Sequence, residues 1–307
     1  MSRAYARAAP SHALPLTMPY EIGNFSEDTA VVADPTRSGR YLANLSPSWN
    51  ILYVFGGMTM ATAVSAARAA VTQPEFELLS ATATYLAPIQ SGPMTLDVRK
   101  LRVGKGAEQL TVEMRHGRPN DEREGSTDLH VVCTFGPKRS SDTRFVDLPF
   151  PAVPAPEAVA RFKPPEGYPG GRFPYRHSVE VRPVLGNMPW DKDWEAGPAH
   201  WMAWHRLRNN PRLADGSLDP LAYVPAADLI GPAVRQAMGP TVKFSMVISL
   251  EICLHIFGRT DSEWLLQDSH ASQARDGYVS GRVNLWDERG QLVAQATQLA
   301  TIKPMVR

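Results

Sequence analysis

The stretch VFGGMTMATAVSAARAAV, residues 54–71, decides the fold because it predicts a helix with few large side chains. Alanine, serine, threonine and glycine make up most of it, so a neighbouring surface can approach its backbone closely. Two glycines at its start allow a tight turn and leave the first N–H groups unblocked. Those groups and the helix dipole favour a partial negative charge nearby. The stretch therefore predicts a helix packed tightly against its own sheet, with a ligand at its N-terminus.

Strand-like segments surround this helix, and the second half of the chain repeats their order. Four strand patterns follow residues 54–71, and four more follow a second predicted helix over residues 220–239. A long helix followed by an antiparallel meander requires a sheet that wraps round the helix. We therefore expect an α+β chain with two antiparallel sheets, each wrapped round a central helix.

A Pro- and Gly-rich segment separates the two halves. Its sequence, DLPFPAVPAPEAVARFKPPEGYPGGRFP, excludes a long helix or an extended ladder. The sequence thus predicts an N-terminal domain over residues 1–146, a linker over residues 147–174 and a C-terminal domain over residues 175–307.

Composition excludes several classes of protein. The net charge of +1 and the lack of a long basic run leave no electrostatic footprint for nucleic acid. Apolar stretches fall short of the roughly 18–20 residues that a membrane helix needs. The two cysteines, Cys133 and Cys253, lie in strand patterns of different halves, which favours a reducing cytoplasm over a disulfide framework. Residues 1–16 are Arg- and Ala-rich without acids, and we interpret them as a disordered or strand-leading segment rather than a targeting signal.

The strand pattern over residues 244–256 alternates between apolar and polar side chains. Ile252 and Leu254 are predicted to point to one face, and Ser249 and Glu251 to the other.

Gln298 and Asp228 stand out from their apolar surroundings. Gln298 falls on the apolar face of the last strand pattern, where an unpaired buried amide would cost about 1–3 kcal/mol. Asp228 lies early in the second predicted helix, where an acidic residue is common. Pro232 removes the N–H that would bond the carbonyl of Asp228, so we expect a distorted helix there. The pattern alone is compatible with a structural or a catalytic role for both side chains.

Segments throughout the chain resemble the acyl-CoA thioesterase II family, which has a tandem, or double, hotdog fold. The first half carries YVFGGMTMATAVSAARAAV, SATATYLAPIQSG and LRVGKG, and the second carries ADL, SLEICLHIF and a final strand ending in QATQ. The resemblance implies an acyl-CoA substrate that is hydrolysed to a carboxylic acid and coenzyme A. It also implies that an Asp, a Ser or Thr and a Gln hold the attacking water, and these correspond to Asp228, Ser249 and Gln298.

The chemistry of thioester hydrolysis suits these residue types. Asp228 would take a proton from the water, while Ser249 and Gln298 would orient it. Backbone N–H groups of Gly57 and Met58 would stabilise the oxyanion. The sequence shows no H-E-x-x-H motif and no Cys/His cluster, so we expect neither a metal nor another cofactor.

Two other functions remain open at this point. A non-catalytic protein that binds acyl-CoA or an acyl carrier could have the same fold. Enoyl-CoA hydration is associated with an Asp five positions before a His, an order and spacing found here only with a glutamate, Glu195 before His200. Edge strands of two fused hotdogs often pair between subunits, so we also expect a homo-oligomer.

Overall fold

The structure, a computed structural model, describes residues 21–117, 126–141, 143, 145–191, 194–240 and 245–304. Residues 1–16 and Phe244, for which predictions were made above, lie outside these ranges. The strands are β1 (Val32–Ala33), β2 (Arg40–Leu45), β3 (Glu77–Tyr85), β4 (Gly92–Gly104), β5 (Ala107–His116), β6 (Leu129–Gly136), β7 (Val179–Leu185), β8 (His200–Leu207), β9 (Ser245–Ile256), β10 (Leu265–Arg275), β11 (Tyr278–Asp287) and β12 (Leu292–Pro304). The α-helices are α1 (Phe25–Asp28), α2 (Gly56–Ala70), α3 (Tyr175–Ser178), α4 (Tyr223–Ala227) and α5 (Gly231–Met238). Short 3₁₀ helices are η1 (Pro47–Trp49), η2 (Pro156–Ala158), η3 (Pro169–Arg172) and η4 (Pro220–Ala222).

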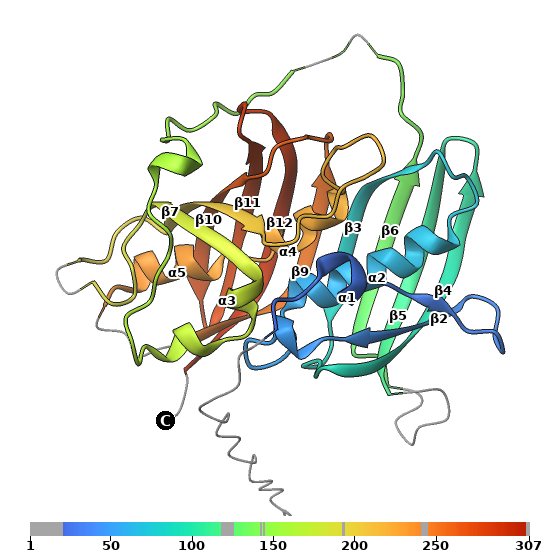
Figure 1. Cartoon of the computed structure of the whole chain (residues 1–307), viewed down its shortest axis with the longest axis horizontal. Coiled ribbons are helices and arrows are strands. Elements are labelled where there is room, and N and C mark those ends of the chain that lie inside the picture. The colour runs from blue at the N-terminus through green and yellow to red at the C-terminus, as the bar shows by residue number, and fades with distance from the viewer. Residues whose placement is uncertain are drawn as a thin grey trace, which may run out of the picture.

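All strands of the described part of the chain belong to one antiparallel sheet. Their order is β1-β2-β4-β5-β6-β3-β9-β12-β11-β10-β8-β7. The first six strands in this order come from the N-terminal half and the last six from the C-terminal half (Figure 1). The sequence predicted two separate sheets, whereas hydrogen bonding continues from one half into the other.

The junction between the halves is the pair β3–β9. Ala83 of β3 lies opposite Ile252 of β9, and Ala81 lies opposite Leu254. Each of these four side chains is buried. Without this pair, each half would expose a strand edge with unpaired N–H and C=O groups. The sequence pattern of one half cannot show that its edge will be satisfied by the other.

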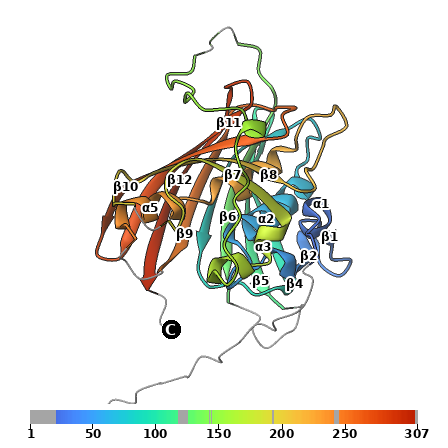
Figure 2. The same ribbon diagram turned by 60° about the vertical axis from the view of Figure 1, so that its left-hand side comes forward.

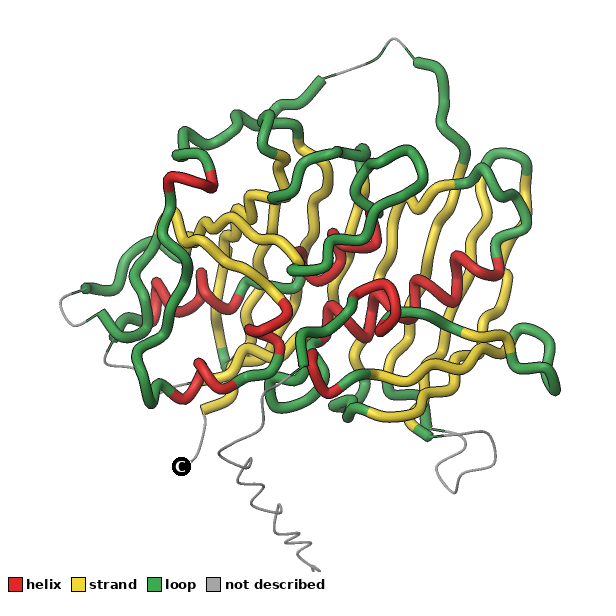
Figure 3. The backbone as a smooth tube through the Cα atoms, in the orientation of Figure 1, coloured by secondary structure: helices red, strands yellow, loops and turns green. Residues whose placement is uncertain are grey.

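The helices lie along one face of the sheet. Figures 1 and 2 show α2 in front of the N-terminal strands and α5 in front of the C-terminal strands. The tube in Figure 3 shows the same arrangement, with the helices in red and the strands in yellow. In the described ranges, no helix combines the length and the apolar character needed to cross a membrane.

Helix α2 is almost completely enclosed, as its small side chains predicted. All residues from Gly57 to Ala67 are buried. Ala63 and Ala66 are fully inaccessible, while Ala69 at the C-terminal end of the helix is exposed. The small side chains therefore permit close contact with the sheet over most of the helix length.

The Pro-rich segment after β6 packs on the opposite face of the C-terminal sheet. Leu148, Val153 and Val159 contact an apolar cluster of buried side chains on or next to β8, β10 and β11. The members of this cluster are Met202, Trp204, Trp264, Leu266 and Trp286. The indole N–H of Trp204 donates a hydrogen bond of 2.9 Å to the carbonyl of Pro154. The segment is therefore part of the packed structure as well as a connector.

A larger side chain in the middle of α2 should destabilise the protein. We expect Ala63→Leu to lower the free energy of unfolding by about 1–3 kcal/mol, because the close-packed interior has no room for the added atoms. Urea unfolding of this variant and of Ala69→Leu, its exposed counterpart in the same helix, measures the effect. Equal stability of the two variants would contradict the tight packing of α2.

Candidate functional site

Asp228 lies at a break in the second predicted helix. Instead of one helix over residues 220–239, the chain forms η4, α4 and α5, and Asp228 terminates α4 with φ −90° and ψ 52°. Pro232 occupies the first turn of α5, where its missing N–H costs nothing. The distortion predicted from Pro232 is confirmed, and it leaves Asp228 between two short helices with its side chain only 5% exposed.

Ser249 reaches Asp228 because of a β-bulge. Leu299 pairs with Glu251 and Ala300 with Ser249, so Leu250 is an extra residue in β9. The extra residue moves Ser249 to the same face as the buried Ile252. The prediction that Ser249 points away from this face was wrong, because simple alternation fails wherever a strand bulges. The exposed position of Glu251 is as predicted.

Three side chains from three elements form a closed set of hydrogen bonds. The hydroxyl of Ser249 donates to Oδ1 of Asp228 at 2.7 Å. Nε2 of Gln298 donates to the same Oδ1 at 2.7 Å and to Oγ of Ser249 at 2.6 Å. The structure therefore brings together the three residues selected from the sequence, at distances of direct contact.

The amide of Gln298 has a fixed orientation. Its Oε1 accepts a hydrogen bond of 3.2 Å from the backbone N–H of Ile230. Ile230 precedes α5, so this N–H is not used by the α-helical ladder. With Oε1 held by a donor, the NH₂ group must face Asp228 and Ser249.

The N-terminus of α2 closes the site from the other half of the chain. The N–H of Gly57 donates a hydrogen bond to the Asp228 carboxylate. A Cβ on Gly56 would lie 2.6 Å from Oδ2 of Asp228, and one on Gly57 would lie 2.5 Å from Cα of Pro225. Both glycines are therefore required for the close approach of α2 to α4, which also explains the paired glycines of the sequence.

Two tyrosines near the carboxylate were missed by the sequence analysis. The hydroxyl of Tyr85 donates to the carbonyl of Gly56 at 2.9 Å. Burial, and secondarily the charge of Asp228, raises the pKa of both Tyr85 and Tyr175 above the usual range. Tyr85 ends β3 and Tyr175 begins α3, and no sequence signal links either position to Asp228.

Burial determines the titration of Asp228. Removal from water raises the pKa of this carboxyl group to about 7, and the hydrogen bonds from Ser249, Gly57 and Gln298 oppose that shift only in part. A carboxyl group with this pKa changes its charge near neutral pH, as a general base working at that pH should.

The backbone N–H of Met58 is already bonded in the structure. It donates to the carbonyl of Phe55 at 2.9 Å. In this geometry Met58 offers no free donor to a ligand, which argues against the oxyanion role that the sequence analysis gave it. The N–H of Gly57 faces the Asp228 carboxylate and therefore the site itself.

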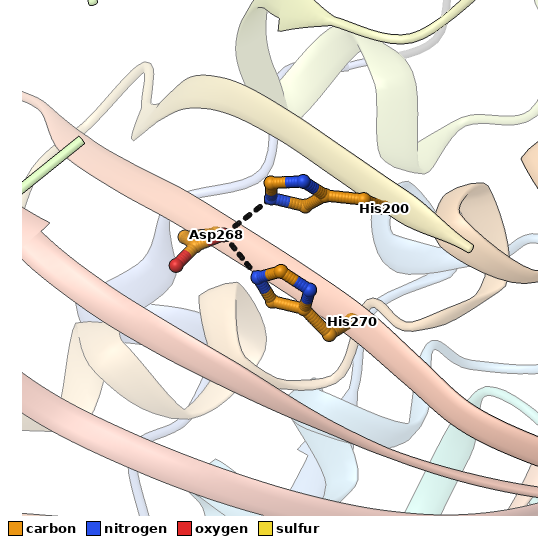
Figure 4. A group of neighbouring side chains, drawn as sticks. All are labelled: His200, Asp268 and His270. Carbon is orange, nitrogen blue, oxygen red and sulfur yellow. Dashed lines mark hydrogen bonds and ion pairs between the residues drawn. The ribbon is translucent and has the colours of Figure 1, made fainter. Parts of the chain in front are cut away.

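A second polar cluster lies on the other face of the C-terminal sheet (Figure 4). Gln267 and Asp268 are consecutive residues of β10, so their side chains point to opposite faces of the sheet. Gln267 donates a hydrogen bond to the carbonyl of Ala226 on the helix face, which places Asp268 on the other face. Nε2 of His200 lies 2.7 Å from Oδ1 of Asp268, and Nε2 of His270 lies 3.0 Å from the same atom. The sequence search for Cys/His clusters did not find this group, because His200 is on a different strand from the other two.

Within the described part of the chain, these three side chains bring their ligand atoms within 4.8 Å of one another, close enough to hold a metal ion. The two imidazole rings are stacked, with centroids 3.8 Å apart and planes at 19°. Stacked rings direct their nitrogen lone pairs nearly parallel, whereas two ligands of one ion must point toward a common centre. The geometry therefore suits two N–H groups that donate to Asp268 better than a metal site, and the sheet separates the cluster from Asp228.

Comparison with protein-family models identifies both halves of the chain. Residues 45–136 match the acyl-CoA thioesterase N-terminal domain, and residues 154–302 match the acyl-CoA thioesterase C-terminal domain. A search of curated proteins finds no match.

Solved structures share the fold at low sequence identity. A protein of unknown function with a hot dog fold from Alicyclobacillus acidocaldarius has a TM-score of 0.74 at 21% identity, covering 92% of this chain and 98% of its own. The acyl-CoA thioesterase II TesB2 from Mycobacterium marinum has a TM-score of 0.68 at 18% identity, with coverages of 92% and 98%. The tesB protein of Mycobacterium avium subs paratuberculosis has a TM-score of 0.69 at 19% identity, with coverages of 92% and 99%. The fold of the chain is therefore of the hotdog type.

The buried carboxyl group of Asp228 should make stability depend on pH. In the unfolded chain this group has a pKa of about 4, whereas the folded value is about 7. Below pH 4 the group is neutral in both states. As pH rises from 4 to 7 the unfolded state loses its proton first, so the folded state loses stability, by up to about 4 kcal/mol.

Asp228→Asn removes this titration, since the amide stays neutral. We expect the stability of the variant relative to wild type to rise between pH 4 and 7 and then to level off. Thermal or urea unfolding at several pH values measures this difference. Asp276→Asn, in the exposed turn between β10 and β11, serves as the matched control. A difference that does not change between pH 4 and 8 would contradict a raised pKa for Asp228.

Proposed function

The chain belongs to the acyl-CoA thioesterase family and is a thioester hydrolase, and from this premise we propose that it cleaves acyl-CoA with a water molecule that Asp228 activates. The observation that supports this mechanism is the contact of a buried carboxylate with both Ser249 and Gln298. The products are a free carboxylic acid and coenzyme A.

In the proposed reaction, water attacks the thioester carbonyl carbon and gives its proton to Asp228. The new C–O bond forms a tetrahedral oxyanion, whose collapse breaks the C–S bond. The thiolate that leaves has a pKa of about 8.5, so it departs without a strong general acid. The proton on Asp228 then returns to solvent or to the departing thiolate.

Ser249 and Gln298 position the water in this mechanism. Their polar atoms lie within hydrogen-bond distance of Oδ1, so a water that binds the carboxylate is also within their reach. The Gln298 amide keeps its orientation because Ile230 holds Oε1. A water held at defined angles reaches the carbonyl carbon with less loss of entropy in the transition state.

Gly57 is the residue that we propose for oxyanion stabilisation. Its N–H lies in the first turn of α2, where the helix dipole favours negative charge. When Asp228 takes up the proton, its demand for this hydrogen bond falls while the carbonyl oxygen gains charge. The same N–H can then stabilise the oxyanion.

We also propose that each half of the chain is one hotdog unit, with domains over residues 1–146 and 175–307 and a linker over residues 147–174. In support of this, each half contributes six strands and a helix that lies on its own part of the sheet.

Replacement of Asp228 should abolish most of the hydrolysis. We expect Asp228→Asn to lower kcat at least about a hundredfold, in line with the loss of a general base. Release of free thiol from acyl-CoAs of short, medium and long chain length measures this. In the wild type, kcat/KM should fall as pH drops below about 7, because the base becomes protonated.

The Asp276→Asn variant should retain wild-type turnover. Equal turnover by the wild type and Asp228→Asn would remove Asp228 from the mechanism. Tight binding of acyl-CoAs without turnover in the wild type would instead favour the non-catalytic binding protein.

A further inference from the structure

A cavity of about 240 Å³ lies in the C-terminal half and is lined by Leu229, the residue that follows Asp228 in the chain. Leu229 and Gly231, which follow Asp228 in the break between α4 and α5, line one part of it. Val247, two residues before Ser249 on β9, and Tyr175 also line it. Leu229 and Val247 thus connect the cavity to the two segments that carry Asp228 and Ser249.

Several side chains on the cavity wall are aromatic. Phe162, Tyr168 and Phe173 come from the second part of the Pro-rich segment, and Trp201 comes from β8. At about 30 Å³ for each water-sized group, 240 Å³ holds about eight such groups. This is the volume of a medium-length acyl chain.

The charges on the cavity wall all have one sign. Arg176 and Arg235 both line the cavity, and the described residues around it include no Asp or Glu. The guanidinium of Arg176 lies over the ring of Phe162, 4.3 Å from its centroid. Two cations in apolar surroundings create a strong preference for an anionic ligand group.

Arg235 has unused hydrogen-bonding capacity. Its Nε is buried without a hydrogen-bond partner, and a terminal nitrogen reaches the carbonyl of Pro189 only at 3.4 Å. Arg235 lines the cavity, and because the 3.4 Å contact is a weak hydrogen bond, its terminal N–H groups can donate to an oxygen acceptor on a ligand. Arg235 lies four residues after Gly231, about 6 Å along the axis of α5.

We propose that this cavity holds the acyl group of the substrate and that Arg235 selects acyl chains with a carboxylate at the end remote from the thioester. The inference rests on the proposed function, since Asp228 defines the end of the cavity at which hydrolysis occurs. A medium-length dicarboxylic acid linked to coenzyme A through one carboxyl group has the required chemistry. Its chain fills the aromatic part, and its free carboxylate pairs with Arg235.

Substrates of equal length separate the two kinds of acyl group. We expect the wild type to hydrolyse octanedioyl-CoA with a kcat/KM at least about tenfold above that for octanoyl-CoA. Arg235→Met keeps an unbranched side chain but removes the charge. It should lower kcat/KM for octanedioyl-CoA by about tenfold to a hundredfold, mainly through KM, with a clearly smaller effect on octanoyl-CoA, so that the preference between the two substrates is lost.

Two further variants complete the design. Arg235→Lys keeps the positive charge and should restore part of the preference for octanedioyl-CoA. Arg275→Met, at a side chain that is 79% exposed, should behave as the wild type. Equal rates for the two substrates in the wild type would overturn the proposal. Equal losses for both substrates in Arg235→Met would also overturn it, because Arg235 would then contact the part that both substrates share.

Binding of amide analogues distinguishes failure of this inference from failure of the proposed function. Titration calorimetry with the monoamide of octanedioic acid and with octanamide, which differ only in the free carboxylate, needs no turnover. Tighter binding of the monoamide by the wild type, lost in Arg235→Met, would support the cavity assignment even in a protein that hydrolyses neither thioester. Hydrolysis of both thioesters without preference, together with equal binding of the two amides, would refute the assignment and leave the thioesterase function intact.

Discussion

The contact between the N-terminus of α2 and the carboxylate of Asp228 is the constraint on which the site depends. It joins a helix of the first half to a helix break of the second, and it forms only because Gly56 and Gly57 carry no Cβ. The β3–β9 pair fixes the two halves in one sheet, so this contact has a defined geometry. An isolated half would have either the helix N-terminus or the carboxylate, and neither alone would form the contact.

The same contact creates a conflict between stability and function. A carboxylate taken out of water disfavours the folded state, and the hydrogen bonds from Ser249, Gln298 and Gly57 offset only part of that cost. A more solvated Asp would be a weaker base with a lower pKa. The fold accommodates the cost because α2 buries a long apolar surface and because the sheet leaves no edge at the junction of the halves.

Sequence reasoning found the residues of the site better than it found their geometry. Asp228 and Gln298 stood out as polar side chains in apolar patterns, and Pro232 signalled the helix break. The pattern left a structural role open for both, and their selection as catalytic candidates came from the family resemblance. The face of Ser249 was mispredicted, since the extra residue at Leu250 is defined only by pairing with β12. The continuous sheet was missed for a related reason, because strand alternation records which face is buried and carries no information about which edge is paired.

Long-range features could not have been read from a single sequence. The polar cluster of Asp268 with two histidines, and the wall of the cavity, both combine strands and segments that are distant in the chain.

The cavity has a further consequence for the direction in which a substrate binds. Asp228 is an anionic group shortly before α5, and Arg235 is a cationic group within that helix. In the proposed binding mode, a carboxylate at the end of an acyl chain is repelled by the first and attracted by the second, so the two charges together would place the thioester at Asp228. An acyl chain without that carboxylate lacks this electrostatic guidance and enters on apolar contacts alone.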